Sequence, residues 1–154
     1  GGFTIASGGD VTAVDADVPL VACLPEIAVS TRDARGVVPD ETPLSSLVET
    51  VGNAATLTAG MCRNDPELVG KGMDDPVVTP VRADLITGYH DVRDAAFDAG
   101  ATGVTVSGAG PTVLAACHRG DRRDIAGAMV EAFVDAGVDA RAYQTNIGRG
   151  AELF

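Results

Sequence analysis

Runs of apolar, β-favouring residues mark four strand positions along the chain. They fall at residues 19–29, 102–106, 112–117 and 138–147. Pro25 interrupts the first run, and because proline cannot donate to a strand ladder we expect a bulge or bend there. Residues 4–18 are more mixed, with a turn at Gly8-Gly9, and the pattern assigns no strand to them.

Helical spacing, together with capping and stop signals, predicts helices between these runs. Ser30, with Asp33 three positions later, resembles a capping box and starts a short helix at 31–37. Thr42 as cap and Pro43 in the first turn start a longer helix. We expect this helix to bury one face, made of Leu44, Leu47, Val48, Val51, Ala54, Ala55, Thr58 and Met61. Further helices are predicted at 66–72, 81–87, 89–99 and 122–136.

The order of these elements predicts the fold class. Strand, helices, strand, strand, helix, strand is the order of a ferredoxin-like split β-α-β sandwich, an α+β fold, here with extra helices in the first crossover. A chain of 154 residues with 45% hydrophobic residues is long enough to bury one such core. The first residue is Gly1 and not Met, so we expect the chain to be part of a longer protein.

Charge and hydropathy exclude several classes of partner. The net charge is −11, from 22 acidic and 11 basic residues, and this field repels nucleic acid and anionic membranes. The acidic side chains are mostly aspartate and Lys71 is the only lysine, a balance that resembles halophilic proteins; an acidic domain from a GC-rich genome is the alternative. No apolar run is long enough to span a membrane and no signal peptide is present, so we expect a cytoplasmic protein.

The residue types that commonly carry metal or nucleophilic chemistry are poorly placed for it. The three cysteines are widely separated in apolar stretches, so we expect buried free thiols and not a zinc site or disulfides; they are Cys23, Cys62 and Cys117. His90 and His118 are interpreted as surface residues, and Asp74-Asp75 as a solvated loop and not a metal site.

The segment from Ser107 to Pro111 is the strongest local motif. Its two glycines, Gly108 and Gly110, allow the backbone to approach a ligand or another loop closely. It lies between two predicted strands and does not match G-x-G-x-x-G, and the chain holds no G-x-x-x-x-G-K-[ST] loop. By pattern alone, a plain hairpin loop is the alternative.

The wider sequence around this loop resembles the GHMP kinases. Residues 100–112, GATGVTVSGAGPT, resemble the third motif of that superfamily. Further segments are similar to its homoserine kinase branch: GGFT at 1–4, PEIAVSTRDAR at 25–35, Asn53 with its helix, PVRADLI at 80–86, and IGRGA at 147–151. The resemblance therefore spans almost the whole chain.

The resemblance implies that this chain is the C-terminal, substrate-binding domain of a kinase. Residues 1–18 would continue from a missing N-terminal domain, and residues 19–154 would form the GHMP kinase C-terminal domain. The Gly/Ser-rich loop that cradles ATP phosphates in these enzymes has no counterpart here, so ATP and Mg²⁺ would be bound mainly by the missing domain. We therefore expect no catalytic residue and no metal ligand in this chain, and no activity from the chain alone.

The same resemblance assigns roles to individual residues. Thr31, Arg35 and Arg82 match positions that contact homoserine, with the arginines at its carboxylate; an arginine fork suits that group. Thr31 and Arg35 are four residues apart and so share one helix face. Ser107, Gly108, Ala109 and Gly110 would support the phosphate-binding loop of the other domain. The alternative for each arginine is a solvated or salt-bridged surface residue.

Three functions stay open from the sequence. The first is transfer of the γ-phosphoryl group of ATP to the hydroxyl of L-homoserine, giving O-phospho-L-homoserine for threonine synthesis. The second is a related kinase that acts on mevalonate, a phosphomevalonate or shikimate. The third is a non-catalytic ferredoxin-like module that binds an amino acid and regulates a partner enzyme. Partners in the first case are homoserine and the N-terminal kinase domain, and a homodimer is left open.

Overall fold

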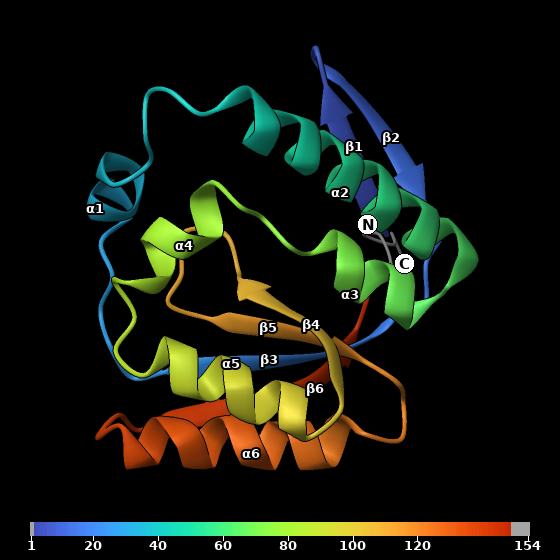
Figure 1. Ribbon diagram of the computed structural model, residues 1–154. Helices are drawn as coiled ribbons and strands as arrows, with labels where there is room; N and C mark the ends of the chain where they lie inside the picture. The colour runs from blue at the N-terminus through green and yellow to red at the C-terminus, as the bar shows by residue number, and fades with distance from the viewer. Residues whose placement is uncertain (1, 149–154) are drawn as a thin grey trace, which may run out of the picture.

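A four-stranded antiparallel sheet lies at the centre of the computed structural model, which describes residues 2–148. Its spatial order is β4-β5-β3-β6 (Figure 1). The strands are β3 (Pro19–Pro25), β4 (Ala101–Val106), β5 (Val113–Cys117) and β6 (Ala140–Asn146). The first strand of this sheet lies between the last two along the chain, as in a split β-α-β unit, so the predicted fold class is confirmed.

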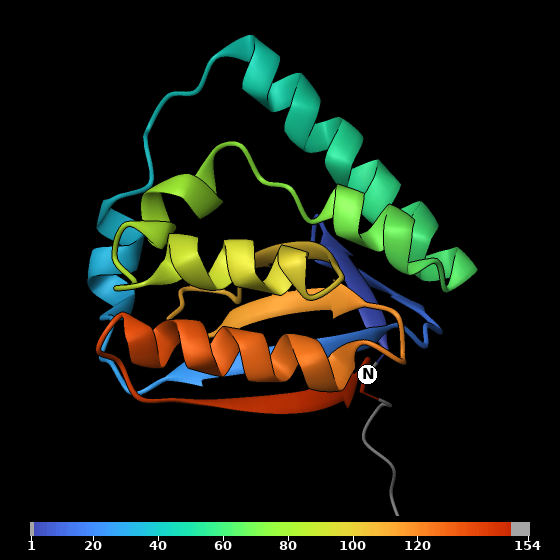
Figure 2. The same ribbon diagram turned by 60° about the horizontal axis from the view of Figure 1, so that its bottom comes forward.

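Alternate side chains of the strands enter two separate cores. On one face, α5 (Tyr89–Asp98) and α6 (Arg122–Asp135) run side by side, as Figure 2 shows, and bury Val92, Ile125, Met129 and Phe133 against Val21 and Cys23 of β3. On the other face, α3 (Pro66–Gly72) and the end of α2 (Leu44–Arg63) bury Val69 and Met61 near Leu20. The period-2 alternation of β3 is what supplies both cores.

Two glycines bring α3 into direct backbone contact with the sheet. A Cβ at Gly103 on β4 would overlap the backbone of Gly70 on α3, and a Cβ at Gly70 would overlap Thr102. Thr102 adds a hydrogen bond from its hydroxyl to the Pro66 carbonyl at 2.8 Å. The absence of both side chains is therefore what fixes the distance between α3 and β4.

The N-terminal segment differs from the prediction. We assigned no strand to residues 4–18, but a hairpin separate from the main sheet lies there. It consists of β1 (Phe3–Ser7) and β2 (Asp10–Val14). The turn at Gly8-Gly9 was correctly predicted, and both glycines have positive φ. Phe3 and Ile5 of β1 are half-buried, but β2 is exposed at every residue except Val14, so the hairpin as a whole gives only a weak apolar pattern.

The helix boundaries were predicted with mixed success. Ser30 caps α1 (Thr31–Gly36) by accepting a hydrogen bond from the Asp33 amide at 3.1 Å, as predicted. Thr42 does not cap α2, because the helix starts after Pro43 with no side-chain cap. The short helix predicted at 81–87 is α4, at Val78–Ala83, and thus starts earlier.

The predicted burial of the α2 face is wrong for its first half. Leu44, Leu47, Val48 and Val51 are 75%, 49%, 65% and 62% exposed, whereas Met61 near the other end is buried. Figure 2 shows why: α2 runs obliquely away from the sheet, and only its C-terminal end approaches α3. None of the helices in the described chain is long and apolar enough to cross a membrane.

Candidate functional site

Arg82 joins three segments that are distant in the sequence. From the last turn of α4, its Nε donates to the Ala34 carbonyl of α1 at 3.1 Å. Its Nη1 donates to the Gly108 carbonyl in the loop between β4 and β5 at 2.7 Å. The guanidinium therefore holds α1 and the glycine loop on either side of itself, which sequence spacing alone does not show.

The start of α4 is fixed by a carboxylate. Asp75 Oδ1 accepts from the amides of Val77 and Val78 at 3.0 Å each, and Oδ2 accepts from the Thr79 amide at 3.3 Å. These bonds satisfy amides that a helix start leaves unpaired. The Thr79 hydroxyl also lies 2.9 Å from the Thr105 hydroxyl of β4. Together they anchor α4, and with it Arg82, to the sheet.

Asp75 is a positioning residue that the sequence analysis missed. We interpreted Asp74-Asp75 as a solvated loop, but Asp75 is half-buried and its carboxylate is fully engaged. The sequence does contain a signal, because an aspartate just ahead of a short apolar stretch is common at the start of a helix. We predicted this helix at 81–87, too far from Asp75 for the aspartate to be recognised as its cap.

Thr31 and Arg35 lie on the short helix that Arg82 contacts. Ala34, whose carbonyl accepts from Arg82, is buried and anchors α1, while Thr31 and Arg35 are both exposed. Neither Arg35 nor Arg82 is among the ion pairs of residues 2–148. In a chain with 22 acidic residues, this removes the salt-bridged alternative within the described residues.

The loop from Ser107 to Thr112 is closed by its own backbone. The Ser107 amide donates to the Thr112 carbonyl at 2.8 Å, and the Gly110 amide donates to the Ser107 carbonyl at 3.0 Å. Gly108 and Gly110 both have positive φ. A Cβ at Gly110 would press on Ile86 and Val106, whereas Gly108 faces open space. Gly110 therefore seats the loop, and Ser107, Gly108 and part of Ala109 remain accessible.

The arrangement suits an anion with a planar fork of oxygens. Arg82 uses Nε and Nη1 on carbonyl groups, so its Nη2 has no hydrogen-bond partner among residues 2–148. Arg35 supplies a second, exposed guanidinium on the adjoining helix. The Nη2 of Arg82 is the one nitrogen of its guanidinium that the described fold does not use, and charged donors of this kind bind carboxylate or phosphate groups.

The cysteines divide into two kinds. Cys23 and Cys117 are buried as predicted, and burial raises the pKa of each thiol to about 11. Cys62 is exposed on α2, so its predicted burial is wrong. The error has the same origin as the exposed apolar face of that helix. The raised pKa values leave the two buried thiols protonated and unreactive near neutral pH.

The histidines lie at the surface, as predicted. His118 Nε2 lies 2.9 Å from a Glu67 carboxylate oxygen, and both side chains are exposed. His90 lies 3.7 Å from Asp84. Among residues 2–148, no three His, Cys, Asp or Glu side chains are grouped so that they could hold a metal ion.

The comparisons with known proteins identify the family. The family model "GHMP kinases C terminal" matches residues 57–135, about half of the chain. The chain therefore belongs to the GHMP kinase family and represents its C-terminal domain. This match includes α4 with Arg82 and the loop at 107–112, two of the three segments that meet at the site.

Within this family, the chain is highly similar to homoserine kinases. The chain is 70% identical over 154 residues to a homoserine kinase of Natronomonas pharaonis, and 68% identical over 154 residues to one of Halorubrum lacusprofundi. It covers 53% of each of these relatives and so spans about half of their length. Both come from haloarchaea, which supports the halophilic interpretation of the acidic composition.

Solved structures agree with this assignment. A crystal structure of homoserine kinase from Cytophaga hutchinsonii matches with a TM-score of 0.89 and 34% identity, over 96% of this chain and 49% of that chain. The L. major mevalonate kinase complex with R-mevalonate matches with a TM-score of 0.66 and 15% identity, over 97% of this chain and 49% of that chain, and shares the fold only.

Proposed function

We propose that this chain is the C-terminal half of an ATP-dependent homoserine kinase. The complete enzyme transfers the γ-phosphoryl group of ATP to the side-chain hydroxyl of L-homoserine, and the product is O-phospho-L-homoserine. The observation that carries the proposal is that Arg82 joins α1, which carries Thr31 and Arg35, to the glycine loop. Relatives that share 70% and 68% of the sequence bear the name homoserine kinase, which favours this substrate over other small anions.

In this proposal, the described residues bind and orient the amino-acid substrate. Arg35 and the remaining Nη2 of Arg82 hold its carboxylate, and Thr31, one helical turn from Arg35, contributes a hydroxyl. Fixing the carboxylate directs the substrate hydroxyl away from α1, so that phosphoryl transfer depends on positioning. Ser107, Gly108, Ala109 and Gly110 form a support against which the phosphate-binding loop of the other half rests.

The N-terminal half supplies the nucleotide site in this proposal. The sequence contains no phosphate-cradling loop of the family type, and the described residues offer no metal-binding group. We therefore assign ATP and its magnesium ion to that half, and derive no step from a metal held by this chain. The exposed apolar face of α2 is the surface that we propose it covers, because the relatives are about twice as long as this chain. We further propose that the enzyme is cytoplasmic, and a homodimer stays an expectation of the resemblance.

The test is ADP release by the whole-length protein that contains this chain, measured in molar potassium chloride. Homoserine, mevalonate and shikimate are offered separately, with the present chain as the control. We expect turnover with homoserine from the whole-length protein and none from the chain alone. Turnover with mevalonate or shikimate instead would contradict homoserine as the substrate. A folded whole-length protein that turns over none of the three would favour a non-catalytic binding module.

A further inference from the structure

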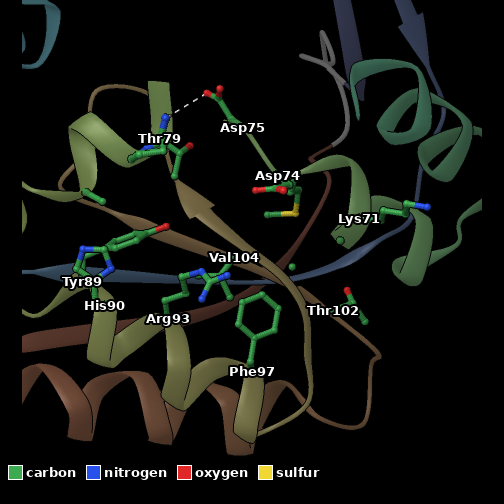
Figure 3. A pocket seen from close by; sticks show the side chains of 15 residues that line it. Lys71, Asp74, Asp75, Thr79, Tyr89, His90, Arg93, Phe97, Thr102 and Val104 are labelled. Atoms are coloured by element: carbon green, nitrogen blue, oxygen red, sulfur yellow. Dashed lines mark hydrogen bonds between the residues drawn. The ribbon is translucent and has the colours of Figure 1, made fainter. Parts of the chain in front are cut away.

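A cavity lies beside α4, and the residues that Arg82 contacts do not line it. It has a volume of about 480 Å³ and is enclosed by the end of α3, the connection to α4, α4 itself, α5 and the edge strand β4 (Figure 3). None of the residues around Arg35 or the glycine loop lines it. Its size is within the range of small-molecule sites.

A tyrosine hydroxyl without a partner in the described part of the chain opens into this cavity. Tyr89 is only 3% exposed, and its hydroxyl forms no hydrogen bond with any residue from 2 to 148. No side-chain polar atom of the described chain is both sealed from solvent and unpaired, so this hydroxyl must reach the cavity. Figure 3 shows the phenol oxygen pointing between Asp74 and Arg93. Because the tyrosine ring is packed in the core, this hydroxyl is held at the cavity wall, where it can hydrogen bond to water or to a ligand.

Opposite charges face that hydroxyl. Burial raises the pKa of Tyr89, while Arg93 lowers this pKa and Asp74 raises it, so both charged groups act on the same phenol. The Arg93 guanidinium lies 4.8 Å above the Phe97 ring, which keeps it at the cavity wall. Its pairing with Asp94 at 3.1 Å is exposed and therefore weak. The Asp74 carboxylate has no ion-pair or hydrogen-bond partner within the described residues.

The charged residues that line the cavity determine which kind of ligand it can bind. Lys71 and His90 are at its rim, but Asp74 and Asp75 lie beside them, so a bare anion such as phosphate would meet a carboxylate. The Asp75 oxygens already accept from three backbone amides, whereas the Asp74 carboxylate has no such partners in the described chain and is the acceptor for a cation. Arg93 and Asp74 are both exposed at the mouth of the cavity, and a ligand that carries both charges pairs with each of them without placing a like charge beside either.

We propose that this cavity is a second ligand site, which binds a small zwitterion of the free α-amino-acid class. Arg93 holds the carboxylate, Asp74 holds the ammonium group, and the Tyr89 hydroxyl hydrogen bonds to one of them. Phe97 and Val104 form the apolar wall for the ligand's side chain.

The two sites share one short helix. Thr79, Pro80 and Ala83 of α4 line the cavity, while Arg82 leaves the same helix toward Ala34 and Gly108. A ligand packed against α4 therefore acts on the orientation of Arg82. This coupling rests on the function proposed above, whereas the binding itself does not.

The test is calorimetric binding to the whole-length protein in molar potassium chloride without nucleotide. The probes are free L-α-amino acids at millimolar concentration, compared with acetate, propylamine and inorganic phosphate. We expect at least one amino acid to bind, and Arg93→Gln, Asp74→Asn and Tyr89→Phe each to weaken it about tenfold or more. The matched variants Arg123→Gln, Asp124→Asn and Tyr143→Phe, which alter exposed residues away from the cavity, should stay within about twofold of the parent.

Three results would overturn the proposal. The first is that no amino acid binds. The second is binding that Arg35→Ala abolishes and Arg93→Gln does not, which would put the ligand at the site near α1. The third is equal binding of acetate or phosphate, which would make the cavity an anion site. None of these measurements depends on catalysis. If the protein binds an amino acid in the cavity but does not phosphorylate homoserine, the proposed ligand site is therefore still supported.

Discussion

Arg82 and Gly108 are 26 residues apart in the sequence, and a hydrogen bond of 2.7 Å from guanidinium to carbonyl joins them. The same side chain donates to Ala34, so one residue links the helix that carries Arg35 to the loop between β4 and β5. The geometry of this arginine thus determines whether two parts of the proposed substrate site keep their relative position.

Replacing Arg82 should loosen the loop as well as weaken substrate binding. Lysine cannot donate to both carbonyls in a fixed fork, so Arg82→Lys should raise the Michaelis constant for homoserine about tenfold or more and leave that for ATP within about twofold. Hydrogen exchange at the Gly110 amide, which is bonded to Ser107, should become faster. Arg123→Lys is the control, and unchanged exchange in the loop would argue against the linking role.

Arg35 should affect substrate binding without affecting the fold. Its side chain is exposed and outside the ion pairs of the described residues, so Arg35→Ala should leave the melting temperature close to that of the parent. We expect the Michaelis constant for homoserine to rise about tenfold to a hundredfold, far more than that for ATP, because a charged hydrogen bond to the carboxylate is lost. Arg32→Ala, on the same helix, is the matched control. Equal changes for both substrates would contradict the role.

The glycine contact between α3 and β4 should be intolerant of a methyl group. Gly103→Ala places a Cβ inside the Gly70 backbone, so we expect a loss of about 2–4 kcal/mol in the free energy of unfolding. Gly127→Ala is the matched control on α6, where a Cβ meets nothing within 4 Å; it should stabilise by about 0.5–1 kcal/mol. Urea unfolding of both variants measures the difference, and a neutral Gly103→Ala would disprove the close contact.

The apolar face of α2 should matter for association and not for folding. Val48→Ser and Val51→Ser alter side chains that are mostly exposed, so the unfolding free energy of this chain should change by no more than about 0.5 kcal/mol. Binding to a separately produced N-terminal half should weaken about tenfold if that half buries them. Val134→Ser changes an equally exposed valine on α6 and should leave binding unchanged. Loss of binding with Val134→Ser alone would place the interface elsewhere.

The two buried thiols should make stability depend on alkaline pH. Burial raises the pKa of Cys23 and Cys117 from 9.0 to about 11, so the unfolded chain loses these protons first. Their contribution is fully present below pH 9.0 and is lost as pH rises to about 11, at most about 2–3 kcal/mol for each thiol. Urea unfolding across this window should show the decline, and Cys23→Ala should reduce its slope.

Cys62 supplies the control for that experiment. Because it is exposed, a thiol reagent should label it in the folded chain, whereas Cys23 and Cys117 should react only after unfolding. Cys62→Ala should keep the decline in stability between pH 9.0 and about 11. Rapid labelling of all three thiols in the folded chain would show that the core is open to solvent.

The elements that the sequence predicted well are those whose signals are local. Ser30 caps the helix that follows it, and the continuous apolar runs of β3 and β5 form the centre of the sheet. A cap needs only its own next turn, and a buried strand needs only its own apolar run. The hairpin β1-β2 escaped prediction because its strands are short and most of their residues are exposed.

Features that depend on residues far away in the sequence could not be predicted from local patterns. The apolar stripe of α2 has a clear helical period, but a period does not say what covers the stripe, and its first half proved exposed. The meeting of Arg82 with Ala34 and Gly108 depends on where Asp75 and Thr105 place α4. The candidate site residues were named through family resemblance, and only the tertiary structure shows that Arg82 contacts the helix of Thr31 and Arg35 and the glycine loop.

The pairing of β3 with β6 also has a consequence for how this domain is made. β3 comes at residues 19–25 and its neighbour β6 at residues 140–146, so the sheet joins opposite ends of the described chain. On the ribosome, β3 emerges early and then has one long edge unpaired until the last strand has been synthesised. The domain should therefore complete its fold only after translation has passed β6, at a rate set by closing this long loop. Nascent chains that stall before that point would display the edge of β3 and be drawn to chaperones or aggregates.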